Sequence, residues 1–275
     1  MAIVNLGRIV APLACCAGLV MATPAMALQI RVTVENLSPV NGTFLTPFWV
    51  GFHDGTFNPV NIGSAAPSFI ERIAEDGDVG PLQAAFTASS MTPLTQGVLF
   101  GPSIPPIGPG QISSLVFNID GNLATSRYFS YASMVIPSND AFVANDDPLE
   151  HMVFDGSGSF LSTSFVLLGS EVLDAGTEIN DEIPLNTAFF GQANPNTGVD
   201  ENGVIQVHSG FQPASNGGIL ASAQFANADF KAPGYQLARV TISAVPEPGI
   251  MMLMGIGLVA LTFPRASRKP QTMAI

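Results

Sequence analysis

Residues 128–136 have the sequence YFSYASMVI and form the clearest strand signal in the chain. Aromatic and β-branched side chains favour strands, and no Gly, Pro or charged residue interrupts the segment. A nearly continuous apolar run is typical of a strand that is covered on both faces. The segment therefore predicts a central strand of a β-sheet.

Segments on either side of it, separated by turn signals, predict further strands. Residues 28–34 alternate apolar and polar side chains, and residues 48–52, FWVGF, form a more fully buried run. The remaining strand predictions are 115–119, 160–168, 204–207 and 236–242. Residues 69–74 predict a short helix, residues 82–90 are ambiguous, and there is no long helix pattern. We expect an all-β fold, an antiparallel β-sandwich of about seven to nine strands.

Composition and charge exclude several classes of protein. Of the 275 residues, 47% are hydrophobic and 11% are charged, which argues against coiled coils and charge-rich disorder. The net charge is −12, so we expect no nucleic-acid partner, because phosphate binding needs clustered Lys and Arg. All 21 acidic residues lie within residues 28–248, beside five basic ones. This acidity favours cations as partners.

The first 27 residues have the pattern of a secretory signal peptide. Arg8 precedes an apolar run over residues 9–21, and Ala25-Met26-Ala27 is a small-x-small cleavage site. We expect cleavage after Ala27. Both cysteines, at positions 15 and 16, would leave with the signal. The exported chain would then depend on core packing or a bound ion in place of disulfides.

The end of the chain has three parts in a fixed order. Pro246-Glu247-Pro248 is followed by an uncharged apolar run over residues 249–263, and Arg265, Arg268 and Lys269 close it. This tail resembles the PEP-CTERM sorting signal of Gram-negative bacteria. The resemblance implies recognition by an exosortase, a membrane protease. It also implies that a hydrophobic helix within 245–270 anchors the chain in the inner membrane until it is processed.

The remaining residues, 28–244, predict one domain in which catalytic signatures are absent. There is no G-x-S-x-G, H-E-x-x-H or P-loop motif, and the three histidines share no metal-binding spacing. We therefore expect no enzyme. Acidic loops are the informative feature, because Ca²⁺ prefers several carboxylate and carbonyl oxygens in flexible loops. The candidate loops are 76–78, 139–147, 174–181 and 200–202.

Several segments of this domain resemble the spondin N-terminal domain family. The segment 129–143, FSYASMVIPSNDAFV, is similar to the family's Met-x-x-Pro-Ser-x-Asp-x-Phe-Val pattern, and residues 174–178, DAGTE, are similar to its Asp-Ala-Gly-Thr-Asp motif. Residues 49–55 and 73–78 resemble earlier segments of bacterial members. The family fold is an antiparallel β-sandwich, which agrees with the strand pattern.

The resemblance implies a calcium site at one end of the sandwich. Its ligands would be Asp140, Asp174 and Glu178, and backbone carbonyls near residues 141 and 142 would add to them. Glu178 stands where the family often has Asp, and the loose geometry of Ca²⁺ should tolerate the longer side chain. A bound ion would relieve the repulsion between these carboxylates and stabilise a domain that has no disulfide.

Two functions from different classes remain compatible with the sequence. The first is a non-enzymatic protein of the cell envelope, outer surface or extracellular matrix, with a role in adhesion or biofilm structure and with exopolysaccharide or matrix proteins as partners. The second is a secreted glycan-active hydrolase or a carbohydrate-binding module that uses the acidic loops. The first fits the tail better, because PEP-CTERM systems usually accompany exopolysaccharide production.

Overall fold

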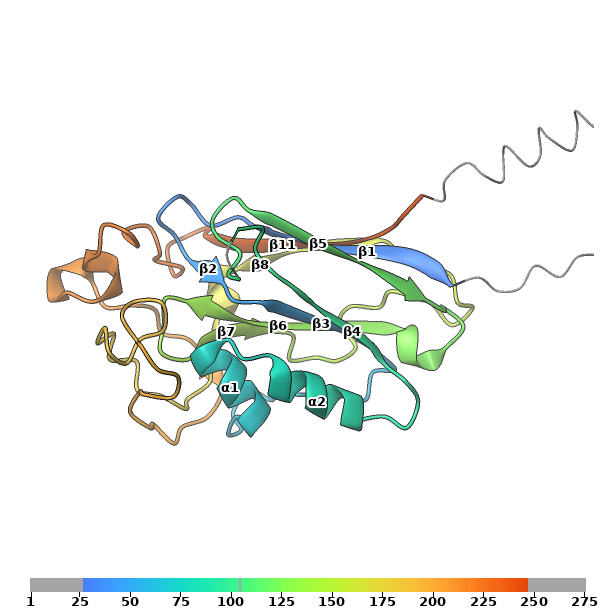
Figure 1. The fold of residues 1–275 in the computed structure, drawn as a ribbon, viewed down its shortest axis with the longest axis horizontal. Coiled ribbons are helices and arrows are strands. Elements are labelled where there is room, and N and C mark those ends of the chain that lie inside the picture. Colours follow the sequence, from blue (N-terminus) through green and yellow to red (C-terminus); the bar gives the residue numbers. More distant parts are fainter. Residues whose placement is uncertain (1–26, 104, 247–275) are drawn as a thin grey trace, which may run out of the picture.

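Two antiparallel β-sheets pack face to face, and two helices cover the outer face of one of them (Figure 1). The computed structural model describes residues 27–103 and 105–246. Four short 3-10 turns, at Ala124–Ser126, Gly169–Glu171, Ala214–Asn216 and Ile219–Ala221, lie in the connections. The architecture is a sandwich with a helical layer on one side.

The first sheet has four strands in the order β5-β1-β11-β8. Their bounds are Ile112–Ile119, Leu28–Asn36, Gln236–Ala244 and Thr163–Leu168. The first and last strands of the domain pair along most of their length, from Ile30 opposite Ala244 to Asn36 opposite Ala238. This pairing places the two termini of the domain at the same end of the sandwich.

The second sheet follows the order β10-β9-β7-β6-β3-β4, and the short strand β2 also pairs with β6. The bounds of β10, β9, β7, β6, β3, β4 and β2 are Gln206–Val207, Leu173–Asp174, Ala141–Ala144, Tyr128–Ile136, Phe48–His53, Thr95–Leu99 and Phe44–Leu45. The strands that lie side by side in this sheet are therefore often distant in the sequence.

Strands β6 and β3 are buried on both faces. Alternate side chains of β3, such as Phe52, enter the core between the sheets, while Trp49 points to the opposite face. Strand β6 behaves in the same way, with Phe129 between the sheets and Ala132 under the helices. This double burial explains why both segments are apolar without strict alternation.

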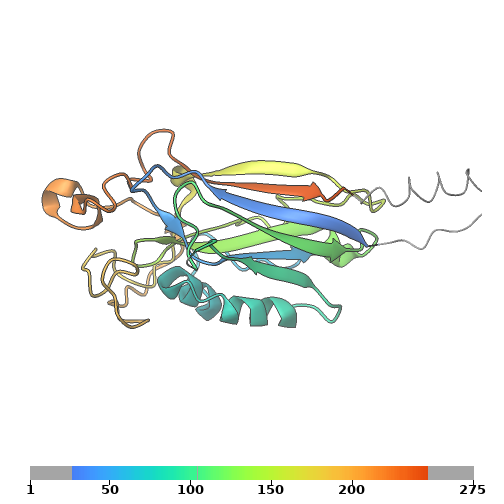
Figure 2. The ribbon, with the colours of Figure 1, turned by 45° about the horizontal axis from the view of Figure 1, so that its top comes forward.

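Helices α1, Ser68–Asp76, and α2, Gly80–Ala88, form the cover of the second sheet (Figures 1 and 2). Helix α1 buries Ile70 and Ile73 against the sheet. The Trp49 ring meets Phe86 of α2 at a centroid distance of 5.0 Å in an edge-to-face arrangement. The Trp49 indole N–H also donates to Gln96 Oε1 at 2.7 Å, which ties β3 to β4.

The predicted strands at 28–34, 48–52, 115–119, 128–136 and 236–242 are confirmed, with small extensions, whereas those at 160–168 and 204–207 are shortened to β8 and β10. The helix predicted at 69–74 is α1, and the ambiguous segment 82–90 is largely α2. Strands β2, β4, β7 and β9 complete the sheets, so the described residues hold eleven strands in place of seven to nine. The predicted C-terminal hydrophobic helix lies outside the described residues.

The two ends of the sandwich differ in character. Both termini of the described domain leave at one end, while the long loops between β9 and β11 gather at the opposite end (Figures 1 and 2). Strand β6 runs antiparallel to β3, away from the end of the sandwich that holds the termini. The turn that joins β6 to β7 therefore also lies at the loop end. The acidic motif residues 140 and 174 therefore lie far from the termini.

Gly51 is expected to be intolerant of a side chain. A Cβ at this position of β3 would lie 2.7 Å from the Trp49 ring and 2.8 Å from the Phe86 ring. Gly51→Ala should lower the free energy of unfolding by about 1–3 kcal/mol, since overpacking displaces both rings. The matched control is Gly156→Ala, where no atom lies within 4 Å of the new Cβ. Urea denaturation of both variants measures the difference, and equal midpoints would contradict the packing.

Candidate metal centre

Asp140 lies in the turn that joins the two inner strands β6 and β7. The Ser138 hydroxyl shapes this turn by donating to the Val135 carbonyl at 2.6 Å and accepting from the Ala141 N–H at 3.1 Å. The Asp140 side chain is fully buried as a result. The strand pairing thus holds a carboxylate inside the protein, next to the loop end of the sandwich.

The two oxygens of the Asp140 carboxylate have different surroundings. Oδ2 accepts from the Thr177 N–H at 2.8 Å, the Thr177 hydroxyl at 3.2 Å and the Glu178 N–H at 3.1 Å. Oδ1 is buried and has no hydrogen-bond partner among the described residues. A buried carboxylate oxygen without a partner is costly, so this atom is a candidate ligand for a cation.

Asp174 ends strand β9 and lies beside the Asp140 turn, since it pairs with Ala141 of β7. Its Oδ1 accepts from the Gly176 N–H at 2.8 Å, and its Oδ2 accepts from the Asn180 side-chain amide at 3.0 Å. These bonds fix the orientation of the carboxylate. The motif at 174–178 therefore folds back over Asp140 and holds both acids at one place.

A histidine supports this orientation from behind. The Gly210 N–H donates to Nδ1 of His208 at 2.9 Å, so the ring proton lies on Nε2, which donates to Asn180 Oδ1 at 3.1 Å. Burial lowers the pKa of His208 to about 4, so the ring is neutral at physiological pH. His208 thus orients Asn180 and Asp174 without supplying a positive charge.

Glu201 reaches the same place from a third segment. The Glu201 N–H donates to the Thr177 carbonyl at 2.9 Å, and the Gly203 N–H donates to the Gly176 carbonyl at 2.7 Å. This close approach requires glycine at 176, where φ is +66° and a Cβ would lie 2.6 Å from the Val204 backbone. The loop around residue 201 is therefore fixed against the Asp-Ala-Gly-Thr motif.

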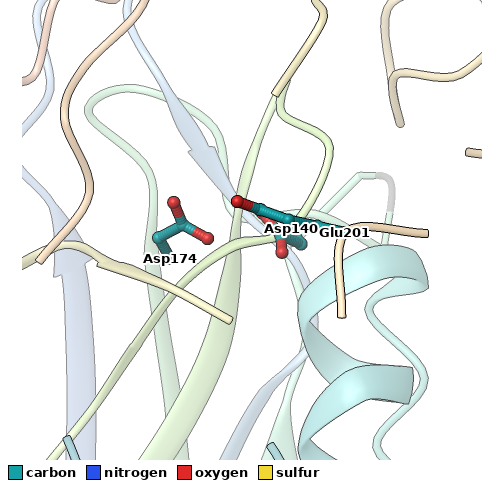
Figure 3. Close-up of side chains that lie close together, drawn as sticks. All are labelled: Asp140, Asp174 and Glu201. Atoms are coloured by element: carbon teal, nitrogen blue, oxygen red, sulfur yellow. The ribbon is translucent and has the colours of Figure 1, made fainter. Parts of the chain in front are cut away.

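Three carboxylates converge at this point, as Figure 3 shows. One oxygen from each of Asp140, Asp174 and Glu201 lies within 4.8 Å of the others. Asp140 and Asp174 are buried, and Glu201 is exposed. The group therefore has an inner wall of two acids and one acid on the solvent side.

Glu178, the third ligand implied by the resemblance, lies outside this group. Its side chain is 3% exposed, and its Oε1 accepts from the Gly198 N–H at 3.0 Å. Its Oε2 is buried without a hydrogen-bond partner in the described part of the chain, and so is Oε2 of Glu75 on α1. The structure thus brings Asp140 and Asp174 together, adds Glu201, and places Glu178 in a neighbouring acidic pair with Glu75.

The pKa shifts follow from burial and mutual repulsion. Burial, followed by the charge of Asp174, raises the pKa of Asp140 to about 7. Burial raises the pKa of Glu178 to about 8, and the charge of Glu75 adds to the shift. Burial and Asp174 also raise the pKa of Glu201. In each case a nearby positive charge would remove the repulsion that the fold imposes.

The residues fit a hard divalent cation. Three carboxylate oxygens from three separate loops are the ligand type and arrangement that Ca²⁺ accepts, and backbone carbonyls in the same loops are oxygen donors too. The unpartnered Oδ1 of Asp140 is the observation that distinguishes this group from an ordinary set of solvated acids. No sulfur or imidazole ligand belongs to the group, which disfavours Zn²⁺.

Sequence reasoning included residue 201 only within a candidate acidic loop. The signal that selects Glu201 is the backbone pairing of its loop with residues 176–178, which no local pattern shows. The predicted sorting residues Glu247 and Pro248, and Ala25 of the cleavage site, lie outside the described residues. Pro246 and Ala27 are the last and first described residues of the domain.

A comparison with protein-family models identifies a PEP-CTERM protein-sorting motif at residues 244–266. The predicted sorting signal is therefore confirmed, and it indicates an exported surface protein that an exosortase processes. The match covers the tail and not the sandwich. A comparison with curated proteins found no match to the chain.

Within residues 27–103 and 105–246, every helix is too short or too polar to cross a membrane. The predicted anchor segment, 245–270, lies almost entirely outside these ranges.

Without a divalent cation, the stability of the protein should fall as the pH rises from 7 to 8, above the range in which the buried histidines titrate in the unfolded chain. Glu178 binds its proton more tightly in the folded state, so the folded chain holds more protons than the unfolded chain in this range. Glu178→Gln should raise the free energy of unfolding at pH 8 by an amount on the order of 1 kcal/mol and flatten this slope. Denaturation in chelator at both pH values measures it.

Asp155→Asn is the matched control for this experiment. Asp155 is a partly exposed residue before a turn, and hydrogen bonds from Ser157 and Ser159 lower its pKa, so it is ionised in both states above pH 5. Its replacement should leave the slope unchanged. Equal slopes in Glu178→Gln and the parent would contradict the buried position of this carboxylate.

Proposed function

We propose that this protein is a non-enzymatic component of the outer surface or extracellular matrix, and that its sandwich binds Ca²⁺ through Asp140, Asp174 and Glu201. The ion holds three loops in one conformation, and that end of the sandwich contacts the matrix. The sorting motif directs the chain to the outside, where exosortase processing releases it from the membrane.

One observation carries the cation site. The Asp140 carboxylate is fully buried, its Oδ1 has no hydrogen-bond partner among the described residues, and carboxylate oxygens of Asp174 and Glu201 lie within 4.8 Å. Without a cation, the fold would have to keep like charges together in a poorly solvated place. A divalent ion would turn this repulsion into an attraction that stabilises the folded state.

The choice of Ca²⁺ rests on ligand type and loop geometry. Ca²⁺ takes six to eight oxygen ligands in flexible arrangements, whereas Mg²⁺ needs a strict octahedron and retains water. The three acids lie in a bend before β7, at the end of β9 and in an irregular loop, and Asp140 already uses one oxygen to accept three hydrogen bonds from residues 177 and 178. Such an arrangement is irregular, which favours the larger ion.

The position of the site supports a role in contact with other molecules. The termini of the described domain lie at one end of the sandwich and the loops that carry the acids at the other (Figures 1 and 2). While the tail holds the chain at the membrane, the calcium end points outward. The resemblance to the spondin N-terminal domain, whose animal members act in adhesion, supports the same role.

Ca²⁺ should raise the melting temperature of the parent protein, and Asp140→Asn with Asp174→Asn should abolish this effect. The variant replaces the carboxylates by amides of nearly the same shape, which removes the charges but leaves one of the two donors to Asp174, the Gly176 N–H or the Asn180 amide, without an acceptor. The apo variant is therefore compared with the apo parent, and the calcium effect is the difference within each protein. A thermal melt with Ca²⁺ and with chelator measures both results.

Two single variants separate the alternative ligand sets. Glu201→Gln should weaken Ca²⁺ binding at least tenfold, while Glu178→Gln should leave the calorimetric dissociation constant within about twofold of the parent. Asp155→Asn serves as the control for a lost surface charge. The opposite ranking would support the set Asp140, Asp174 and Glu178, and no Ca²⁺ binding by the parent would refute the site.

Replacing Pro246, Glu247 and Pro248 by Ala should block processing by the exosortase. The protein should then accumulate in the membrane fraction with its tail intact, whereas the parent reaches the surface with a lower mass. Cell fractionation with intact-mass measurement tests this. Gln271→Ala with Thr272→Ala, beyond the matched motif, is the control, and normal release of the triple variant would count against the sorting motif as the recognised element.

A further inference from the structure

A second acidic pocket lies at the opposite end of β7 from the metal centre. Asp140 precedes this strand, whereas Asn145 and Asp146 follow it, and four strand residues extend over about 13 Å. The pocket has a volume of about 230 Å³ and is lined by residues of β6, the loop after β7, the turn at Gly169–Glu171 and strands β9 and β10. It therefore lies apart from the proposed calcium ligands.

A buried tyrosine contributes to the lining of this pocket. Tyr131 of β6 is 6% exposed, and its ring packs in the core, stacked on Phe48 at a centroid distance of 5.7 Å and an angle of 14°. Among the described residues, none forms a hydrogen bond with its hydroxyl group. A phenol that is buried to this extent usually has a partner. The ring of Tyr131 is buried, whereas its hydroxyl group opens to the pocket, where it can accept a hydrogen bond from a ligand.

The pocket also carries uncompensated negative charge. Asp146, Glu150 and Glu171 line it, and their charges, after burial, raise the pKa of Tyr131. Glu150 lies among the same charges, since burial, Asp146 and Glu171 raise its pKa. Among the described residues, arginine forms ion pairs between Arg72 and Asp76 and between Arg239 and Glu35. Neither pair includes an acid of this pocket.

The nearby histidine does not neutralise the pocket. Nε2 of His151 lies 3.6 Å from Glu150 Oε2. The His151 ring is stacked on Phe165 at a centroid distance of 3.8 Å, and burial lowers its pKa to about 4. It is therefore neutral at physiological pH. The negative charge of the pocket remains for an external cation.

The shape of the pocket favours an organic cation over a metal ion. Among the described residues, carboxylates converge within metal-binding distance at Asp140, Asp174 and Glu201, and the acids of this pocket do not. Apolar side chains form part of its wall, with Ile62 and Val207 about half exposed and Leu173 buried. Spread acids next to apolar walls suit an ammonium group on an alkyl chain.

We propose that this pocket binds a primary alkylammonium group, with the ammonium among Asp146, Glu150 and the Tyr131 hydroxyl and with the alkyl chain against Ile62 and Val207. The group belongs either to a free amine or to a lysine side chain of another protein. This site is independent of the proposed calcium site, so either can fail alone.

Calorimetric titration of the purified full chain with pentylamine, in saturating Ca²⁺ at pH 7.5, tests the proposal. We expect saturable binding to one site and no binding of pentanol, which has the same chain length without the charge. N-acetyl-lysine amide is the second probe. Stronger binding of pentylamine identifies a free amine as the source, and stronger binding of the lysine derivative identifies a side chain.

Two variants assign the binding to this pocket. Tyr131→Phe keeps the ring in the core and removes the hydroxyl, and Glu150→Gln changes an exposed side chain. Each should weaken amine binding at least tenfold, whereas the control Asp120→Asn, which also removes one charge, should leave it unchanged. Absence of saturable binding, equal affinity in all variants, or displacement of the amine by additional Mg²⁺ would overturn the proposal.

Discussion

The fold depends on strand β6 being buried on both faces. Every residue from Phe129 to Ile136 is buried, so one side of the strand must meet the opposing sheet and the other must meet the helices. This requirement fixes the layers, because β3 beside it has the same double burial and Gly51 leaves room for Trp49 and Phe86. Apolar packing in these two cores thus stabilises the domain, since the described residues contain no cysteine to form a disulfide.

The same strand carries the chemistry at its end. Because a short turn joins β6 to β7, the carboxylate of Asp140 is buried inside the protein. One of its oxygens is used to hold residues 177 and 178, which makes it a structural acceptor, and the other remains without a partner among the described residues. The loops that Asp140 anchors bring Asp174 and Glu201 close to it. The cost of burying these acids and the benefit of a bound cation are two aspects of one arrangement.

Local patterns in the sequence predict the long strands and helix α1, because alternation and apolar runs are properties of neighbouring residues. They leave α2 ambiguous, since its nine residues GPLQAAFTA have little amphipathic contrast. Strand β7 has four residues, too few for a period to show. The resemblance to the spondin motifs predicts Asp140 and Asp174 as ligands, and the pairing of β7 with β9 brings these two residues together. The sequence does not predict Glu201 as a ligand. Its position depends on hydrogen bonds between the backbones of loops 176–178 and 200–203, and such bonds produce no pattern of side chains along the sequence.

The spacing of the charges distinguishes the two proposed acidic sites. At the loop end, oxygens converge within 4.8 Å, a distance that a small divalent ion can bridge and that an alkylammonium group cannot fill efficiently. At the other end of β7, the acids line a pocket whose wall also contains apolar side chains and the Tyr131 phenol. A metal ion alone would not contact the apolar part of this wall. Net charge attracts cations to both places, and geometry separates them. The two proposals are therefore compatible, because an ion that fixes the loops at one end of β7 would leave the pocket at the other end open to an amine.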